Sequence, residues 1–167
     1  MKVKEEHDII IEKHPYFQSL NKKLLKDVND IGYPLSYQTN VKAKHSDWKI
    51  STPTVDLVTE WIMNLLKIKY PWIDQREHKI FVEHAWFAEY SKNEFTVIHD
   101  HAPYVWSYVY FIQCPKGSSP LIFNTSGKRI KAEEGKVVIF PANVYHSVPP
   151  NKCDNRIVMA GNLHINI

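Results

Sequence analysis

The sequence predicts a mostly β protein, a double-stranded β-helix or jelly roll, with N-terminal helices packed outside it. Three observations support this prediction. Apolar residues recur at helical intervals in two segments of the first third of the chain. From residue 79 onward the pattern changes to short β-branched and aromatic runs. Turn-forming residues separate these runs at intervals that are typical of an antiparallel sandwich or barrel.

Two helices are expected before residue 79. One covers residues 17–31, and the other covers residues 54–68. In both, the apolar residues recur every three or four positions, so that each helix presents one apolar stripe to a sheet. Thr54 follows Pro53 and precedes Asp56, and we expect it to cap the second helix.

The strands are expected from residue 79 to the end of the chain. Residues 79–90 alternate and place one set of side chains on one face, namely Ile80, Val82, His84, Trp86, Ala88 and Tyr90. The later runs are 95–98, 104–113, 121–123, 136–140, 144–148 and 156–165. About seven strands of this length make a small jelly roll.

Length and composition indicate one globular domain. The 167 residues are 44% hydrophobic and 23% charged, which is typical of such a domain. We expect a single domain over residues 1–167, with a helical N-terminal cover at 1–78 and a jelly-roll core at 79–167.

Charge and hydropathy exclude several classes of partner. The net charge is only +3, and the basic residues alternate with acidic ones, so we expect no nucleic-acid partner. No stretch is long and apolar enough for a membrane span, and the first residues lack the pattern of a signal peptide. The two cysteines form neither a CxxC pair nor a disulfide framework. A cytoplasmic protein without a membrane partner is expected.

Three histidines form a candidate metal site. His99 and His101 are two residues apart, so that both side chains face the same way on a strand, and His146 lies 45 residues further on. Imidazoles suit iron, zinc, copper and nickel, and three ligands leave coordination positions open. A single histidine on a strand is usually structural. We therefore expect the other six to be structural or exposed: His7, His14, His45, His78, His84 and His164.

Arg156 is the candidate anchor for a carboxylate. It lies ten residues after His146 and begins an alternating strand whose inward face carries no acidic residue. A charge on an inward face is costly unless it is paired, and a guanidinium binds a carboxylate through two parallel hydrogen bonds. Two interpretations stay open: a bound small carboxylate, or a surface ion pair with Asp154 or Glu134.

The order and spacing of these residues resemble those of the Fe(II)- and 2-oxoglutarate-dependent oxygenases. The motif of that family is His-x-Asp/Glu, a long gap, His, and then Arg or Lys near ten residues on. Tyr90-Ser-Lys-Asn93, five residues and His99 are similar to the Tyr-x-x-Gly-x5-His run of its prolyl-4-hydroxylase-like branch. Asn93 replaces the glycine, and asparagine tolerates the same left-handed backbone. The run from His99 to Tyr110 is similar to that of a bacterial and phage subfamily with a His-x-His motif.

The resemblance implies a site and a reaction. Fe(II) would be bound by His99, His101 and His146, with 2-oxoglutarate as cosubstrate. Its distal carboxylate would be held by Arg156, with Tyr90 donating a hydroxyl and Asn162 as a weaker candidate. With O2, such an enzyme is a dioxygenase that hydroxylates a peptidyl or small-molecule substrate while 2-oxoglutarate becomes succinate and CO2.

The third metal ligand stays open. His101 stands where the family usually has a carboxylate. Asp100 is the alternative anionic ligand, although strand alternation turns it away from the two histidines.

Two alternative functions also stay open. Gly135-x5-Pro141 and His146 resemble the second motif of the cupins, and a cupin-type metal-dependent dioxygenase would not use 2-oxoglutarate. Arg156 would then bind the carboxylate of the substrate itself. A non-catalytic barrel is the third possibility. Tyr104, Trp106 and Tyr145 flank the ligands and are expected to form either an aromatic mouth or part of the core.

Overall fold

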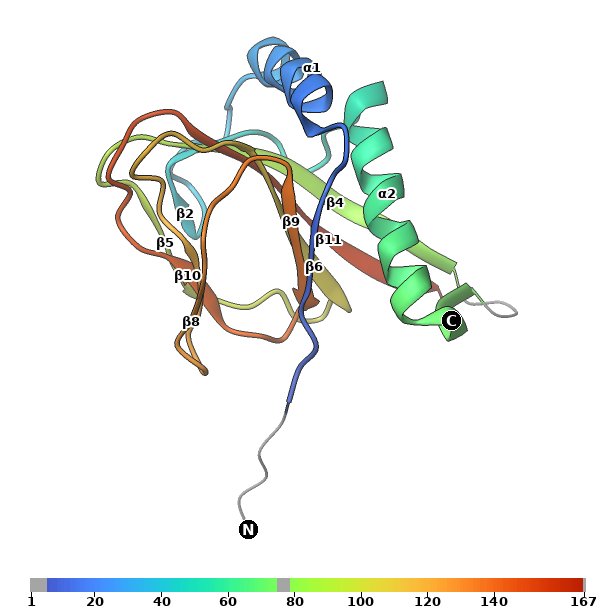
Figure 1. Cartoon of the computed structure of the whole chain (residues 1–167). Helices are drawn as coiled ribbons and strands as arrows, with labels where there is room; N and C mark the ends of the chain where they lie inside the picture. The colour runs from blue at the N-terminus through green and yellow to red at the C-terminus, as the bar shows by residue number, and fades with distance from the viewer. Residues whose placement is uncertain (1–5, 75–78, 167) are drawn as a thin grey trace.

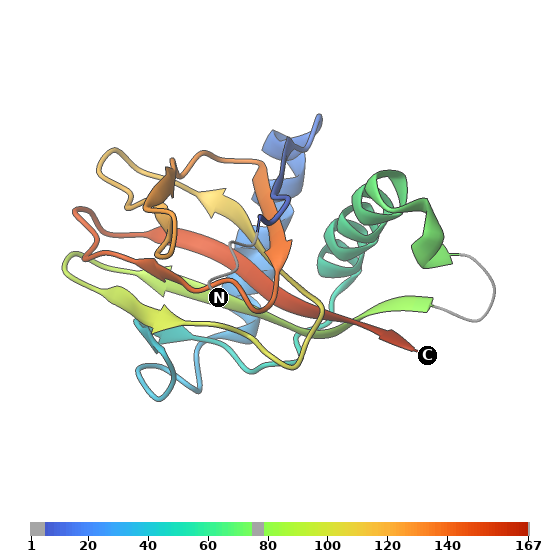
Figure 2. The ribbon, with the colours of Figure 1, turned by 90° about the horizontal axis from the view of Figure 1, so that it is seen from below.

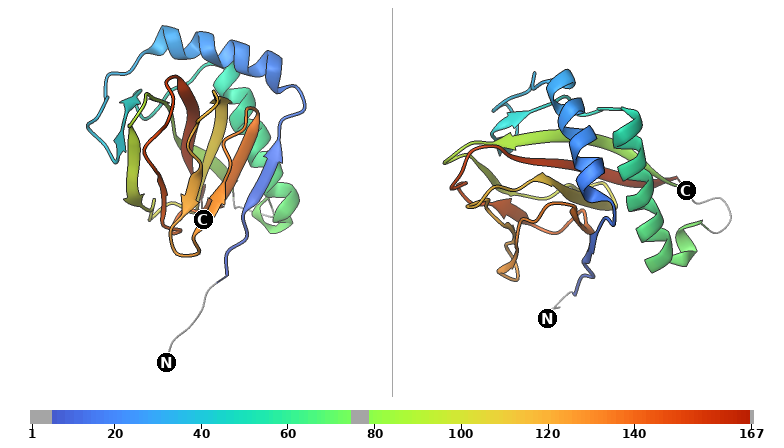
Figure 3. Two further views of the ribbon diagram at one scale, coloured as in Figure 1. Left: turned by 60° about the vertical axis from the view of Figure 1, so that its left-hand side comes forward. Right: turned by 45° about the horizontal axis from the view of Figure 1, so that its top comes forward.

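The computed structural model describes residues 6–74 and 79–166. Two antiparallel sheets face each other, and two helices cover the outer side of the larger one (Figures 1 and 3). The larger sheet has the order β1 (Ile10–Lys13), β9 (Lys136–Pro141), β6 (Trp106–Gln113), β11 (Arg156–Asn166), β4 (Lys79–Tyr90) and β3 (Lys44–His45). The smaller has the order β2 (Val41–Lys42), β5 (Phe95–His99), β10 (His146–Val148), β7 (Leu121–Phe123) and β8 (Lys128–Ile130).

The two helices occur where the sequence predicts them. They are α1 (Phe17–Ile31) and α2 (Pro53–Lys69), and a short 3-10 helix, η1 (Pro71–Asp74), follows α2. The predicted cap of α2 is wrong by two residues. Thr52, not Thr54, precedes the helix, and its hydroxyl accepts a hydrogen bond from the backbone N–H of Val55 at 3.1 Å. Pro53 then occupies the first helical position, where its missing N–H costs nothing.

Two apolar layers hold the molecule together. One lies between the helices and the outer face of the larger sheet, with Leu24, Ile62 and Met159 fully buried. The other lies between the sheets and contains Trp86 and Val158. Figure 2 shows β4 and β11, the two longest strands of the larger sheet, side by side. The larger sheet is therefore covered on both sides, which explains why its central strands are nearly continuously apolar.

A β-bulge corrects the predicted face of β4. Ile80 and Val82 pack in the layer under the helices, whereas Trp86, Ala88 and Tyr90 face the space between the sheets. The pairing of β4 with β11 shifts register next to Asn162. One extra residue in a strand reverses the faces of all the residues beyond it, so simple alternation fails along a strand of this length.

The N-terminal part does more than cover the sheets. It supplies three short strands, β1, β2 and β3, to the edges of the two sheets. Residues 41–45 pass from the edge of the smaller sheet to the edge of the larger one, with Ala43 fully buried between them. Among the described helices, none combines the length and apolar character that a membrane span needs.

Candidate functional site

Three histidine side chains meet at one end of the space between the sheets. His99 ends β5 and lies directly opposite His146, the first residue of β10, while His101 lies in the loop just after β5. Their candidate ligand nitrogens all lie within 4.8 Å of one another. The ring centroids are 4.4 Å apart for His99–His146, 4.8 Å for His99–His101 and 5.0 Å for His101–His146.

A bulge in β5 directs His99 inward. Thr96 pairs with Val148 and His99 with His146, so two residues of β5, Val97 and Ile98, lie opposite one residue of β10, Ser147. Without the extra residue, Thr96 and His99 would face opposite sides of the sheet. With it, Thr96 is buried beside Tyr90, and His99 still reaches the other two histidines.

Backbone carbonyls orient two of the three rings. Nδ1 of His99 lies 2.8 Å from the carbonyl oxygen of Val97, and Nδ1 of His146 lies 2.9 Å from that of Val144. A carbonyl can only accept, so each Nδ1 carries the proton and each Nε2 offers a lone pair. Nitrogens bound to one metal at about 2.1 Å lie about 3 Å apart in octahedral geometry, so the histidine cluster fits one ion after a small closure.

Burial keeps the three imidazoles uncharged. Burial first, and then the neighbouring histidines, lower the pKa of His101 to about 2 and that of His146 to about 4. The pKa of His99 is also lowered, first by burial. Neutral imidazoles are the form that binds metal, so at neutral pH no proton has to leave before an ion binds.

Asp100 lies outside this cluster. Its carboxylate faces the backbone N–H of Ala102 at 3.4 Å and is not among the groups that could share one ion with His99 and His146. Of the two candidates for a third ligand, the structure brings His101 to the cluster.

Arg156 is completely buried between the sheets. Its Nε donates to the carbonyl oxygen of Ser119 at 3.1 Å, and its guanidinium lies 4.5 Å from the ring centroid of Tyr90 and 5.6 Å from that of Phe111. Nη1 and Nη2 have no hydrogen-bond partner among the described residues. Two parallel donors without an acceptor form the fork that a carboxylate matches.

The surface ion pair considered for Arg156 is wrong. The carboxylates of Asp154 and Glu134 instead accept hydrogen bonds from the backbone N–H groups of Lys92 and Cys114, at 2.9 and 3.1 Å. Arg156 is also too deeply buried for a surface pair.

Tyr90 and Asn162 lie on the same two paired strands as Arg156. Tyr90 is directly opposite Arg156, and its hydroxyl exchanges a 2.7 Å hydrogen bond with Thr96. If Thr96 donates this bond, the proton of Tyr90 is available to a ligand. The side-chain oxygen of Asn162 accepts a 2.9 Å hydrogen bond from Ser107, so half of its amide is already used within the sheet.

The inner face of β4 connects the histidines to the arginine. The ring of Trp86 lies 6.0 Å from that of His101, and four residues further along β4 the ring of Tyr90 lies under Arg156. Four strand residues span about 13 Å. An imidazole-bound ion, a five-carbon dicarboxylate and the long arginine side chain can bridge that distance.

Aromatic residues outside the motifs, together with Trp86, lie beside the histidine cluster. Trp48 lies 5.0 Å from Trp86, and the fully buried His45 stacks on Trp86 at 5.7 Å. Trp106 is on the helix side, where it stacks on Tyr70 at 5.7 Å, so it is part of the core and not of a mouth.

The other two residues predicted for the mouth have different surroundings. Tyr145 is 51% exposed. The ring of Tyr104 meets that of His84 edge-on, with 5.3 Å between the ring centroids.

Of the remaining histidines, His78 lies outside the described residues.

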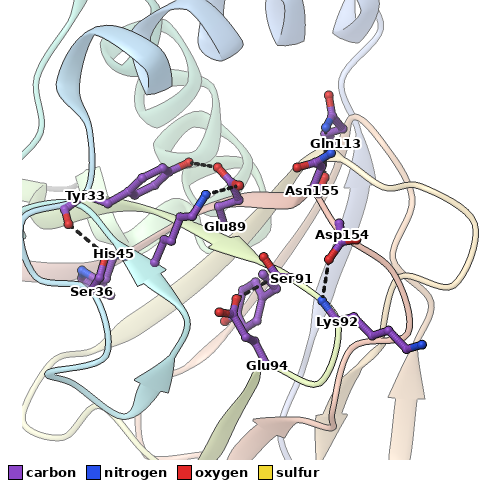
Figure 4. A network of polar contacts seen from close by, with 12 residues as sticks. Tyr33, Ser36, His45, Glu89, Ser91, Lys92, Glu94, Gln113, Asp154 and Asn155 are labelled. Atoms are coloured by element: carbon purple, nitrogen blue, oxygen red, sulfur yellow. Dashed lines mark hydrogen bonds and ion pairs between the residues drawn. The ribbon is translucent and has the colours of Figure 1, made fainter.

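Polar contacts fix the loop between β4 and β5 at the arginine end (Figure 4). The backbone N–H of Lys92 donates to Asp154, and that of Ser91 donates to Glu94 at 2.6 Å. Asn93 has φ of 70°, which confirms the left-handed backbone expected from its place in the motif.

Comparison with known proteins finds similar proteins among solved structures. No family model and no curated protein matches the chain. A viral collagen prolyl hydroxylase from Paramecium bursaria Chlorella virus-1, solved with 2-oxoglutarate, superposes with a TM-score of 0.73 at 16% identity over 94% of this chain and 96% of that one.

Two cellular enzymes are similar as well. A prolyl-4-hydroxylase from Pseudomonas putida has a TM-score of 0.69 at 16% identity, covering 95% of this chain and 92% of its own. A prolyl hydroxylase from Trichoplax adhaerens, solved with a peptide fragment, has a TM-score of 0.68 at 11% identity, over 92% and 82%. At these identities the likeness establishes the fold.

Proposed function

We propose that the protein is an Fe(II)- and 2-oxoglutarate-dependent dioxygenase that hydroxylates a peptidyl or small-molecule substrate. One observation carries the proposal: three neutral imidazoles and a buried, unpaired guanidinium face the same space between two sheets. The fold shared with prolyl hydroxylases supports it. In this interpretation the two sheets are the halves of a double-stranded β-helix, and the chain is one domain.

His99, His101 and His146 would hold the metal, with His99 and His146 binding it through Nε2. The carbonyls of Val97 and Val144 keep two of the rings in the correct tautomer and orientation. Three protein ligands would leave coordination positions open, as a catalytic metal needs. When iron and 2-oxoglutarate are bound, they supply an oxidative decarboxylation that is coupled to hydroxylation of a C–H bond.

Arg156 would bind the distal carboxylate of 2-oxoglutarate through Nη1 and Nη2. The rings of Tyr90 and Phe111 restrict the guanidinium to one position, and the Tyr90 hydroxyl can donate to the same carboxylate. Charge balance favours this arrangement. The three histidines bring no negative charge, so the two carboxylates of the cosubstrate face the two cationic groups of the site, the metal ion and Arg156.

The decisive test is an anaerobic titration of the metal-free protein with Fe(II) and then with 2-oxoglutarate. The visible charge-transfer band from iron to a chelating ketoacid is expected to appear. Iron binding without the band would favour a cupin-type dioxygenase, in which Arg156 binds the substrate's own carboxylate. Failure to bind iron would refute the metal site and favour a non-catalytic barrel.

The substrate is proposed only as a class. Three solved structures with this fold are prolyl hydroxylases, one of them with a peptide fragment. Peptidyl proline is therefore the first substrate to test, by succinate release. We also propose a reducing, cytoplasmic setting, supported by the unpaired Cys114 and Cys153.

A further inference from the structure

We propose that Asn151 is the residue that positions Arg156 for the carboxylate of the cosubstrate. The inference rests on the proposed function and adds to it a residue outside every motif found in the sequence. Asn151 does not touch the ligand in this account. It acts through the peptide that holds the guanidinium and through the strand end that lies beneath it.

The side-chain oxygen of Asn151 holds the peptide of Ser119, whose carbonyl oxygen accepts a hydrogen bond from Arg156. The carbonyl oxygen of Ser119 accepts the 3.1 Å hydrogen bond from Nε of Arg156. The backbone N–H of the same Ser119 donates to Oδ1 of Asn151 at 2.9 Å, and its hydroxyl donates to the carbonyl oxygen of Pro150 at 3.0 Å. Ser119 and Asn151 are 4% and 1% exposed, so water does not replace these bonds readily.

The side-chain nitrogen of Asn151 binds the backbone of Tyr90, the residue whose ring lies beneath Arg156. Nδ2 donates to the carbonyl oxygen of Tyr90 at 3.4 Å and to that of Cys153 at 2.7 Å. The backbone of Asn151 exchanges two further 2.8 Å hydrogen bonds with Asn93 and Glu94, in the loop whose polar contacts Figure 4 shows. One buried side chain thus joins the segment that carries Ser119 to the strand that carries Tyr90.

These bonds determine where the guanidinium fork points. Because Nη1 and Nη2 have no partner among the described residues, the position of the group depends on the Nε bond and on the aromatic rings. A ligand binds more tightly to a group that is already held in place, since less side-chain entropy is lost on binding. Removing the Asn151 side chain leaves the Ser119 N–H unpaired and leaves Ser119 held by its hydroxyl bond to Pro150, so the peptide that binds Arg156 becomes more mobile.

The test compares two buried asparagines in the full-length protein. Asn151→Ala removes the positioning residue. Asn21→Ala is the matched control, because Asn21 is 5% exposed and also makes two buried hydrogen bonds, to the Ile112 carbonyl and from the Tyr110 hydroxyl, both at 2.7 Å and on the helix side of the sheet. For each variant we would measure the dissociation constant of 2-oxoglutarate from the anaerobic charge-transfer band. The hydrogen exchange of the Arg156 Nε–H in the metal-free protein, followed by NMR, gives a second measurement.

The expected result is specific to Asn151. Its alanine variant should bind 2-oxoglutarate about tenfold more weakly, the effect of one lost buried hydrogen bond, and its Arg156 Nε–H should exchange faster, while the affinity for iron stays unchanged. Asn21→Ala should alter neither quantity. If Asn151→Ala does not fold, Asn151→Ser, whose hydroxyl is too short to reach the Ser119 N–H, should show the same change.

Two results would overturn this inference and leave the proposed function intact. One is that Asn151→Ala has the wild-type affinity for 2-oxoglutarate and the wild-type exchange rate of the Arg156 Nε–H. The other is that Asn21→Ala weakens 2-oxoglutarate binding as much as Asn151→Ala does. A wild type that binds iron and shows no band overturns the proposed function, and this inference with it.

Discussion

Replacing Arg156 by methionine should make the unliganded protein more stable while it removes cosubstrate binding. The guanidinium is fully buried with two nitrogens unpaired. The effective cost of burying an ion is several kcal/mol. Contacts with Tyr90 and Phe111 offset about 2 kcal/mol of this cost, and the bond to Ser119 offsets about 1 kcal/mol more. Methionine fills a similar volume without charge, so we expect a net gain of about 2 kcal/mol.

Thermal unfolding with and without ligand measures both effects. For a chain of this length, about 2 kcal/mol raises Tm by about 4–8 °C. With Mn(II) bound, adding 2-oxoglutarate at about a thousand times its Kd should stabilise the wild type by about 4 kcal/mol. Arg156→Met should gain nothing from the cosubstrate. The order of the two Tm values therefore reverses when 2-oxoglutarate is added.

Two outcomes would refute this reasoning. A lower Tm for unliganded Arg156→Met would mean that the guanidinium stabilises the fold. A shift on adding 2-oxoglutarate as large as that of the wild type would mean that Arg156 does not bind it. Arg156→Lys serves as the control: it keeps the buried charge and loses the fork, so it should lose cosubstrate affinity without the gain in stability.

Three further predictions concern the metal cluster and the fold. His146→Ala should lower the affinity for Mn(II) or Fe(II) by about 100-fold or more, measured by calorimetry, and unchanged affinity would contradict the site. The pKa values of His101 and His146 are about 2 and about 4 in the folded protein and about 6.5 when unfolded, so between these values the unfolded state binds more protons. The free energy of unfolding of the metal-free protein should therefore fall below pH 6.5, by up to about 1.4 kcal/mol per pH unit for each histidine, and stay level above it; His101→Leu should reduce the slope in urea titrations. Thr52→Ala should cost about 1 kcal/mol by loss of the α2 cap, and an equal or larger loss in Thr54→Ala would contradict the observed cap.

Long periodic segments could be predicted from the sequence, and short edge segments could not. The helix at 17–31 and the strand at 79–90 have the predicted bounds, because many residues contribute to each pattern. The strands β1, β2, β3 and β8 have two to four residues each, too few for any period to show. Their pairing depends on neighbours that are distant in the sequence. The equally short β7 could be predicted only because it is an apolar run between turn residues.

The candidate site was partly predictable for a similar reason. The His-x-His pair, the distant histidine and the arginine are recognisable by spacing, and the structure brings the three histidines together. The bulges in β4 and β5 have no sequence signal, yet they decide that Trp86, Thr96 and His99 all face inward. Ser119 contacts Arg156 through its backbone carbonyl, and the side chain of Asn151 binds backbone groups of residues distant in the sequence, so their residue types alone could not show their place beside Arg156.

The buried polar groups that lack hydrogen-bond partners indicate why the candidate site lies between the two sheets. His99 and His146 each offer an Nε2 lone pair, His101 adds a third ring nitrogen, and the buried guanidinium offers two nitrogens, Nη1 and Nη2, without an acceptor. Buried polar atoms without partners destabilise a fold, and apolar residues at the same positions would pack the space between the sheets at lower cost. The lone pairs of the histidine nitrogens at one end of this space favour binding of a cation. The N–H groups of Arg156 at the other end favour binding of an anion. A metal ion together with a dicarboxylate satisfies both ends at once, and a dicarboxylate that chelates the ion also links them along the inner face of β4.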